Sequence, residues 1–186
     1  MNDTRPTVVL VQPQMGLSGE FSQHLPLSLL YVAAPLKKLG VRVEILDTRV
    51  IEQDWRIRLS ELLTTNPLWV GFTVMAGFPT AHALEISRFV KKGASIPVVW
   101  GGAMPTVDAR SCLNDPAIDF AVAGSGIAAT TMLTEAIMDG RTSDIEYLQT
   151  IPGLAFKVNG QHFLNQRFHG FEHISYPELP YEIIKD

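Results

Sequence analysis

Short apolar runs alternate with amphipathic segments along most of the chain. The runs are rich in β-branched residues and predict five strands, at 7–11, 41–46, 68–74, 97–100 and 118–122. Between and after them, apolar residues recur at helical spacing and predict helices over about 26–40, 53–65 and 79–92, a short one ending near residue 113, and one over about 128–138. Strand and helix therefore alternate five times.

This alternation predicts an α/β fold with a doubly wound, five-stranded parallel sheet and right-handed crossovers. The fold class is Rossmann-like or flavodoxin-like, with strand order 2-1-3-4-5. Beyond residue 150 the pattern changes, because two short apolar runs flank Asn159-Gly160, a strong hairpin signal. We divide the chain into a domain over 1–150 and a hairpin with a linker-like connector over 151–186.

Two adjacent glycines, Gly101 and Gly102, follow the buried run Val98-Val99-Trp100. They either form a tight turn or allow a ligand to approach the main chain closely. In the predicted sheet, this turn shares the carboxyl edge with the loops at 12–25, 73–80 and 124–127. All four loops contain glycine, and two of them contain a glycine pair or Gly-x-Gly, so the edge presents backbone N–H groups to a large, flat or phosphate-bearing ligand.

Composition excludes several function classes. The formal net charge is −4 and the basic residues are scattered, so we expect neither nucleic acid nor a membrane surface as a partner. Cys112 is the only cysteine, which excludes a disulfide within the chain and a cysteine-bound iron-sulfur cluster. The first apolar run is too short for a signal peptide or a membrane span, and we predict a cytoplasmic protein.

The candidate catalytic groups are few. None of the five histidines has the spacing of a metal site on a helix, and Cys112 fits an inert core thiol. Asp47 and Asp119 fit capping or surface roles. No Gly-x-Gly-x-x-Gly follows the first strand and no P-loop is present. The sequence therefore predicts no catalytic residue and no metal ligand.

Several motifs together resemble one family. They are the helix over 26–40, the run 70–77, Trp100-Gly101-Gly102 with Pro105-Thr106, the path from Asp119 to Gly124-x-Gly126, Ile151-Pro152-Gly153-Leu154, and Leu179-Pro180-Tyr181-Glu182. In order and spacing, these resemble the N-terminal cobalamin-binding domain of cobalamin-dependent radical S-adenosylmethionine enzymes, of the class B methyltransferase type. The last motif resembles the connector that enters the catalytic barrel of those enzymes.

The resemblance implies that cobalamin, with its cobalt, lies over the carboxyl edge and that its nucleotide tail is detached from the metal. The implied binding residues are Gln14, Leu17, Thr73, Val74, Met75, Ala76, Gly77, Gly101, Gly102, Met104, Gly124, Ser125 and Gly126. Methionine-synthase-like members supply a cobalt ligand from Asp-x-His-x-x-Gly after the first strand. Gln12 to Leu17 contains neither the Asp nor the His, so we predict no histidine ligand and expect Met75, Gly77 or Phe78 under the corrin.

The chain also departs from the family. Met104 stands where members often have histidine, and Ser125 and Ile127 replace acidic residues. One cysteine cannot form the three-cysteine cluster motif, so S-adenosylmethionine and the 4Fe-4S cluster are expected only in a separate catalytic domain of the parent protein. The chain alone is not expected to catalyse a reaction.

Two alternatives belong to other classes. A flavodoxin-like or receiver-like domain would bind a nucleotide or a partner protein, but a receiver needs acidic residues where Gln12 and Thr73 stand. A stand-alone hydrolase would need a nucleophile and a base, which the sequence does not offer.

Overall fold

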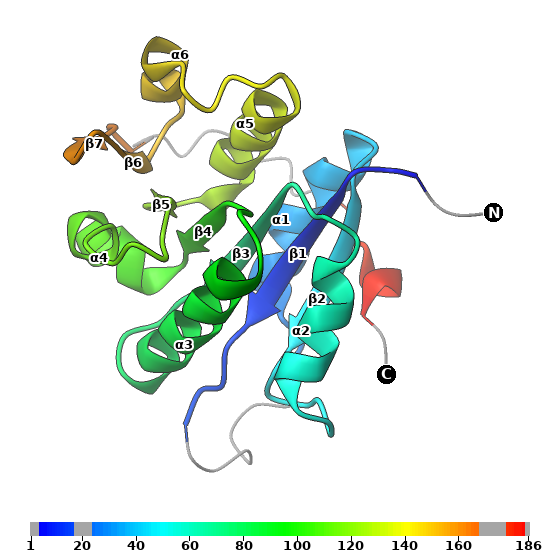
Figure 1. The fold of residues 1–186 in the computed structure, drawn as a ribbon. Coiled ribbons are helices and arrows are strands. Elements are labelled where there is room, and N and C mark those ends of the chain that lie inside the picture. Colours follow the sequence, from blue (N-terminus) through cyan, green and yellow to red (C-terminus); the bar gives the residue numbers. More distant parts are fainter. Residues whose placement is uncertain (1–3, 17–23, 168–177, 185–186) are drawn as a thin grey trace.

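The structure is a computed structural model that describes residues 4–16, 24–167 and 178–184. One sheet with the strand order β2-β1-β3-β4-β5-β6-β7 forms its centre (Figure 1). The first five strands are parallel: β1 (Thr7–Gln12), β2 (Arg42–Asp47), β3 (Trp69–Thr73), β4 (Val98–Gly101) and β5 (Phe120–Val122). The predicted doubly wound fold and its 2-1-3-4-5 order are confirmed.

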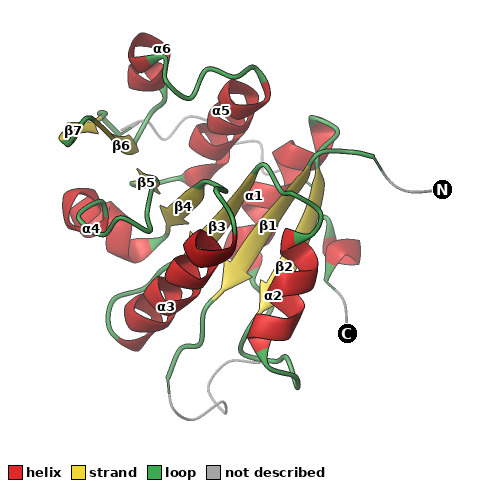
Figure 2. Ribbon diagram, in the orientation of Figure 1, coloured by secondary structure: helices red, strands yellow, loops and turns green. Residues whose placement is uncertain are grey.

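Helices cover both faces of the sheet (Figure 2). One face packs against α1 (Leu27–Lys38), α5 (Gly126–Met138) and α6 (Ile145–Thr150), and the other against α2 (Trp55–Leu63), α3 (Phe78–Gly93) and α4 (Ala103–Cys112). The strands have buried side chains on both faces, which explains their nearly continuous apolar sequence. None of the helices in the described ranges is long and apolar enough to cross a membrane.

Two tryptophans tie helices to the sheet from opposite faces. Trp69 on β3 donates its indole N–H to Thr134 Oγ1 on α5 over 3.0 Å, and Trp100 on β4 donates to Ser87 Oγ on α3 over 3.0 Å. Both indoles are almost fully buried, and a buried indole N–H needs such an acceptor. These bonds fix α5 and α3 beside the central strands.

The C-terminal hairpin continues the same sheet. β6 (Leu154–Val158) pairs antiparallel with β5, and β7 (Gln161–Leu164) pairs with β6. The connecting residues Asn159 and Gly160 both have positive φ, 50° and 79°, as a two-residue type I′ turn requires. The predicted hairpin is therefore confirmed, and it lengthens the sheet to seven strands. The division of the chain at residue 150 stays a prediction.

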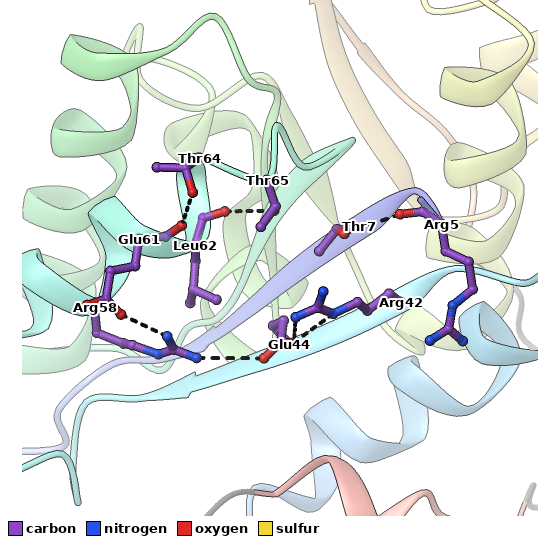
Figure 3. A network of polar contacts seen from close by, with 9 residues as sticks. All are labelled: Arg5, Thr7, Arg42, Glu44, Arg58, Glu61, Leu62, Thr64 and Thr65. Carbon is purple, nitrogen blue, oxygen red and sulfur yellow. Dashed lines mark hydrogen bonds and ion pairs between the residues drawn. The ribbon is translucent and has the colours of Figure 1, made fainter. Parts of the chain in front are cut away.

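The opposite edge of the sheet carries charge. Glu44 on β2 is almost buried, and its carboxylate accepts from Arg42 Nη2 at 2.5 Å and lies 3.8 Å from Arg58 Nη2 of α2 (Figure 3). Charged side chains along an edge strand disfavour pairing with the edge of another sheet. The segment 178–184, with the short helix η2 (Tyr181–Ile183), lies beside β2 and α1, where Glu182 pairs with Lys37 (Figure 1).

Candidate functional site

A cavity of about 140 Å³ opens at the carboxyl edge of the sheet, on the face covered by α1 and α5. Hereafter it is called the slot. Side chains of α1, β1, β3, β4, β5 and α5 line it together with the glycine turns after β4 and β5. Its lining residues are Leu10, Ser28, Leu29, Val32, Trp69, Gly71, Phe72, Thr73, Val99, Gly101, Gly102, Val122, Gly124, Gly126 and Thr130. None of them carries a charge.

The inner part of the slot is apolar and flat because Trp69 lies against a glycine. A Cβ on Gly71 would stand 2.3 Å from Trp69 Cζ3 and 3.1 Å from Leu10 Cδ2, so only glycine leaves room for the indole. Thr130 adds a hydroxyl, but this hydroxyl already donates to Gly126 O over 2.6 Å. The inner walls therefore suit an aromatic or aliphatic group.

The mouth of the slot consists largely of main chain. Gly102, with φ 96° and ψ −161°, adopts a conformation that is essentially restricted to glycine. A Cβ there would lie 2.8 Å from Val74 N and 2.9 Å from Val74 O. Gly101 differs, because its φ is not positive and a Cβ would meet only Phe72 O, at 3.7 Å. The turn requires Gly102, whereas Gly101 leaves open space at the mouth.

Helix N-termini face this edge without side-chain caps. The N-cap residues of α1, α3, α4 and α5 are Pro26, Gly77, Gly102 and Ser125, and none of them makes a capping hydrogen bond through its side chain. By contrast, Asp54 caps α2 and Asp144 caps α6. Free N–H groups in the first turn of a helix favour anions and carbonyl oxygens of a ligand. The glycine-rich loops place such helix ends around one opening, and in α4 the N–H of Met104 already donates to Val74 O.

The structure brings some of the predicted binding residues to the slot and places others nearby. Those that line it are Thr73, Gly101, Gly102, Gly124 and Gly126. Met75, Ala76, Gly77 and Ser125 are exposed and lie in the turns after β3 and β5, at the same edge of the sheet. Val74 is fully buried, and Met104 packs against the core of the opposite face. Leu17 lies outside the described residues.

Gln14 is held away from the slot by a histidine. Its backbone N–H donates to His82 Nδ1 over 3.0 Å, and its side chain reaches Thr48 O at 3.4 Å. The imidazole lies edge-on to Trp55 and is stacked on Phe78. Burial lowers the pKa of His82, which agrees with a neutral ring whose Nδ1 is an acceptor. His82 thereby anchors the start of the loop after β1.

Sequence reasoning missed the walls contributed by α1 and the inner strands. Ser28, whose Oγ lies 3.4 Å from Thr73 Oγ1 across the mouth, carries no motif that marks it. Gly71 did carry a signal, since glycine inside a buried strand often marks a close approach. The inner surface also depends on Trp69, which reads in sequence as an ordinary core residue.

The remaining candidate groups have structural roles. Asp47 pairs with Arg49 at 2.6 Å, and Arg49 also donates to His24 O. Asp119 accepts the N–H of Val98 at 2.7 Å, at the opposite edge of the sheet from the slot. Burial raises the pKa of the Cys112 thiol to about 11. In the described ranges, no three His, Cys, Asp or Glu side chains form a group that could hold a metal ion.

Comparison with known proteins identifies the family. The family model for the B12 binding domain matches residues 21–133, which is more than half of the chain. The chain belongs to the B12-binding domain family. A search of curated proteins gave no match. Family membership makes cobalamin the ligand expected for this B12-binding domain, and it agrees with the resemblance found in the sequence.

Solved structures of radical S-adenosylmethionine enzymes are among those similar to this chain. The radical S-adenosylmethionine methyltransferase TsrM from Kitasatospora setae, with tryptophan and a S-adenosylmethionine analogue bound, is 25% identical with TM-score 0.71, covering 86% of this chain and 30% of that one. The structure of TsrM with cobalamin and a [4Fe-4S] cluster bound is 22% identical with TM-score 0.73, and the match covers 94% of this chain and 31% of that one. The cobalamin-dependent S-adenosylmethionine radical enzyme OxsB, with aqua-cobalamin and S-adenosylmethionine bound, is 18% identical with TM-score 0.69. That match covers 89% of this chain and 23% of OxsB. The chain thus spans less than a third of each.

The residues of the slot fit cobalamin. An apolar cavity of about 150 Å³ holds one benzene-sized molecule, and the slot, at about 140 Å³, is of that size. Cobalamin carries one aromatic base on its nucleotide tail, together with a flat corrin ring edged by amides. Because the mouth has glycines in place of side chains, the corrin amides can approach main-chain N–H groups there. The apolar interior suits the aromatic base.

Proposed function

We propose that this B12-binding domain holds cobalamin over the carboxyl edge of its sheet, with the nucleotide tail in the slot. The observation that supports this most is the slot itself, which combines a glycine-rich mouth with an apolar interior. The tail would enter the slot between α1 and α5, where the mouth lacks side chains at Gly101, Gly102, Gly124 and Gly126. Trp69 would form the inner wall against the base.

The other predicted residues take two roles in this proposal. Met75, Ala76, Gly77 and Ser125 would contact the corrin from the exposed turns after β3 and β5. Val74 and Met104 would support the turn at Gly102, since Val74 N donates to Gly101 O and Met104 N donates to Val74 O. Gln14 would border the site through the loop that His82 anchors.

We further propose that no histidine of this chain binds the cobalt ion. Bound cobalamin supplies a cobalt ion that can accept and release a methyl group, and an axial imidazole changes its reactivity. His82 is buried among Trp55 and Phe78, and its Nδ1 is occupied by Gln14 N–H. His162 lies on β7, two strands away from β5. Neither imidazole is among the groups that line the slot.

The chain would act as the cofactor module of a larger enzyme. We propose that its partner is a radical S-adenosylmethionine domain of the same parent protein, which carries S-adenosylmethionine and the 4Fe-4S cluster, and that the parent is a methyltransferase. The likeness to TsrM supports this, at 25% identity over 86% of the chain. In this proposal, the slot residues bind and orient the cofactor and exclude water from it, and the chemistry occurs in the partner domain.

A binding titration tests the function. The purified chain is mixed with hydroxocobalamin, passed through a desalting column, and the visible spectrum is recorded. We expect one cobalamin per chain to elute with the protein. Gly126→Leu serves as a matched variant, because a Cβ at Gly126 stands 3.4 Å from Val32 and a longer side chain would fill the mouth. It should fold and elute colourless. A colourless wild-type protein would refute the proposal.

The axial ligand is tested separately. The cobalt(II) form of the complex is examined by electron paramagnetic resonance for hyperfine splitting from a coordinated nitrogen. We expect no such splitting in the wild type. Splitting that persists with cobinamide and disappears in His82→Ala or His24→Ala would show a histidine ligand and contradict the prediction.

A further inference from the structure

Arg167 lies beside Gly124, a glycine that lines the slot, and itself lines a neighbouring hollow together with Thr106 and Asp108. It follows β7, and its exposed side chain crosses over Gly124. A Cβ built on Gly124 would stand 3.6 Å from Arg167 Cδ and 3.9 Å from Arg167 Cγ. The methylene groups of this arginine therefore cover the glycine that lines the slot.

Hydrogen bonds from the main chain and from one side chain fix the segment that carries Arg167. Gly153 N donates to Gln166 O at 2.9 Å, and the Asn165 amide donates to Leu148 O and Ile151 O at 2.7 and 2.8 Å. Gly153 in turn accepts from Ala123 N, one residue before Gly124. The two residues before Arg167 are thus held in place, and Gly153 links Gln166 to the turn after β5, which places Arg167 beside that turn.

The charge of Arg167 is not paired within the described residues, and Asp108 is the acidic residue that lines the same hollow. No acidic side chain of that part of the chain forms an ion pair with the Arg167 guanidinium, and no charged residue lines the slot. Beyond Gly124, the first turn of α5 adds N–H groups that no side chain caps. Uncapped helix N–H groups and a guanidinium each favour an anion, above all a phosphate, which a guanidinium can bind through two parallel hydrogen bonds.

We infer that Arg167 binds the phosphodiester of the cobalamin nucleotide tail at the mouth of the slot. This rests on the proposed function, and it adds a specificity: the site selects corrinoids that carry the complete tail. The phosphodiester is the anionic group that joins the corrin side chain to the nucleotide. Cobinamide, which lacks the phosphate, ribose and base, offers Arg167 no anion.

Two ligands and three variants test the inference. The dissociation constants of cobalamin and of cobinamide are measured by absorption titration for the wild type, Arg167→Gln, Arg167→Lys and Arg110→Gln. Arg110, exposed in the last turn of α4, is the matched control for loss of one arginine. We expect Arg167→Gln to bind cobalamin roughly 5- to 20-fold more weakly, with cobinamide unchanged within about twofold. Arg167→Lys should recover part of the loss, and Arg110→Gln should match the wild type.

The salt dependence gives a second measure that does not need cobinamide binding. Screening weakens an exposed ion pair, so the wild-type affinity should fall as salt rises and that of Arg167→Gln should fall less. Equal cobalamin affinity and equal salt dependence in wild type and Arg167→Gln would overturn the inference while leaving the proposed function intact. An equal loss for cobinamide would also overturn it, since the contact would then be to the corrin. Absence of cobalamin binding by the wild type would refute the proposed function instead.

Discussion

The two adjacent glycines at the end of β4, Gly101 and Gly102, give a sharp test, because the structure assigns them different roles. Replacing Gly102 by alanine places a methyl group 2.8 Å from Val74 N and 2.9 Å from Val74 O, both main-chain atoms of a buried residue. Gly102 also has φ 96° and ψ −161°. Alanine at Gly101 meets only Phe72 O, at an ordinary 3.7 Å. Gly102→Ala should therefore damage the fold, and Gly101→Ala should not.

The magnitude follows from three contributions. A non-glycine residue in this backbone region costs about 1–3 kcal/mol, and overpacking against atoms that cannot yield costs about 1–3 kcal/mol. The lower entropy of the unfolded alanine chain returns about 0.4–1 kcal/mol. The sum for Gly102→Ala is roughly 2–5 kcal/mol of lost stability. Gly101→Ala keeps only the entropic contribution and should be neutral or stabilising by less than about 1 kcal/mol.

Urea unfolding followed by circular dichroism measures both variants, and thermal unfolding checks them. For a chain of this length, the expected loss in Gly102→Ala corresponds to a Tm lower by about 10 °C. Gly101→Ala is then titrated with cobalamin. Its methyl group projects toward the mouth of the slot, so we expect cobalamin binding to weaken although the protein is as stable as the wild type.

The reasoning fails if the two variants behave alike. Equal stability of Gly102→Ala and the wild type would mean that the Val74 main chain moves aside, against the observed bonds of Val74 to Gly101 and Met104. Unaltered cobalamin affinity of Gly101→Ala would mean that the ligand does not approach this glycine. Each outcome bears on only one of the two roles.

Three more predictions concern stability and reactivity. Because burial lowers the pKa of His82, the unfolded chain takes up a proton on this residue at a higher pH than the folded chain does, so stability falls as the pH drops below about 6.5. The free energy of unfolding should therefore differ less between pH 7.5 and pH 5.5 in His82→Asn than in the wild type. An equal difference in the two proteins would contradict this prediction. Gly153→Ala should cost more than about 2 kcal/mol, because its Cβ would stand 2.3 Å from Ala123 O, whereas Gly160→Ala, which meets nothing within 4 Å, should cost less in the same urea assay. With its pKa raised to about 11, buried Cys112 should react with a thiol reagent only after unfolding, and rapid labelling of the folded protein would refute its burial.

Much of the fold could be predicted because local patterns and global architecture agree. The run at 7–11 is apolar without alternation, and this is the pattern of a strand buried on both faces. Asn159-Gly160 specified the hairpin, since few other dipeptides accept positive φ at both positions. Helix ends were less certain: α5 begins at Gly126, whereas the sequence predicted about residue 128.

The candidate site was predictable only in part. The glycines at 101, 102, 124 and 126 marked the edge, because glycine in a loop after a strand signals close approach or unusual φ. The sequence does not separate Gly101, which leaves open space, from Gly102, which the turn requires. Nor does it show that Met104 packs on the opposite face of the sheet from the slot.

The sequence by itself determined the alternation of strands and helices and the glycine-rich carboxyl edge, because periodicity and turn chemistry are local properties. The strand order was predicted from the fold class that this alternation indicates. Only the tertiary structure decided that Trp69 closes the slot over Gly71, that β6 joins β5, and that Arg167 lies over Gly124. These contacts join residues that are far apart in the chain or depend on how side chains share a buried volume. Their existence depends on packing in three dimensions, which no local pattern encodes.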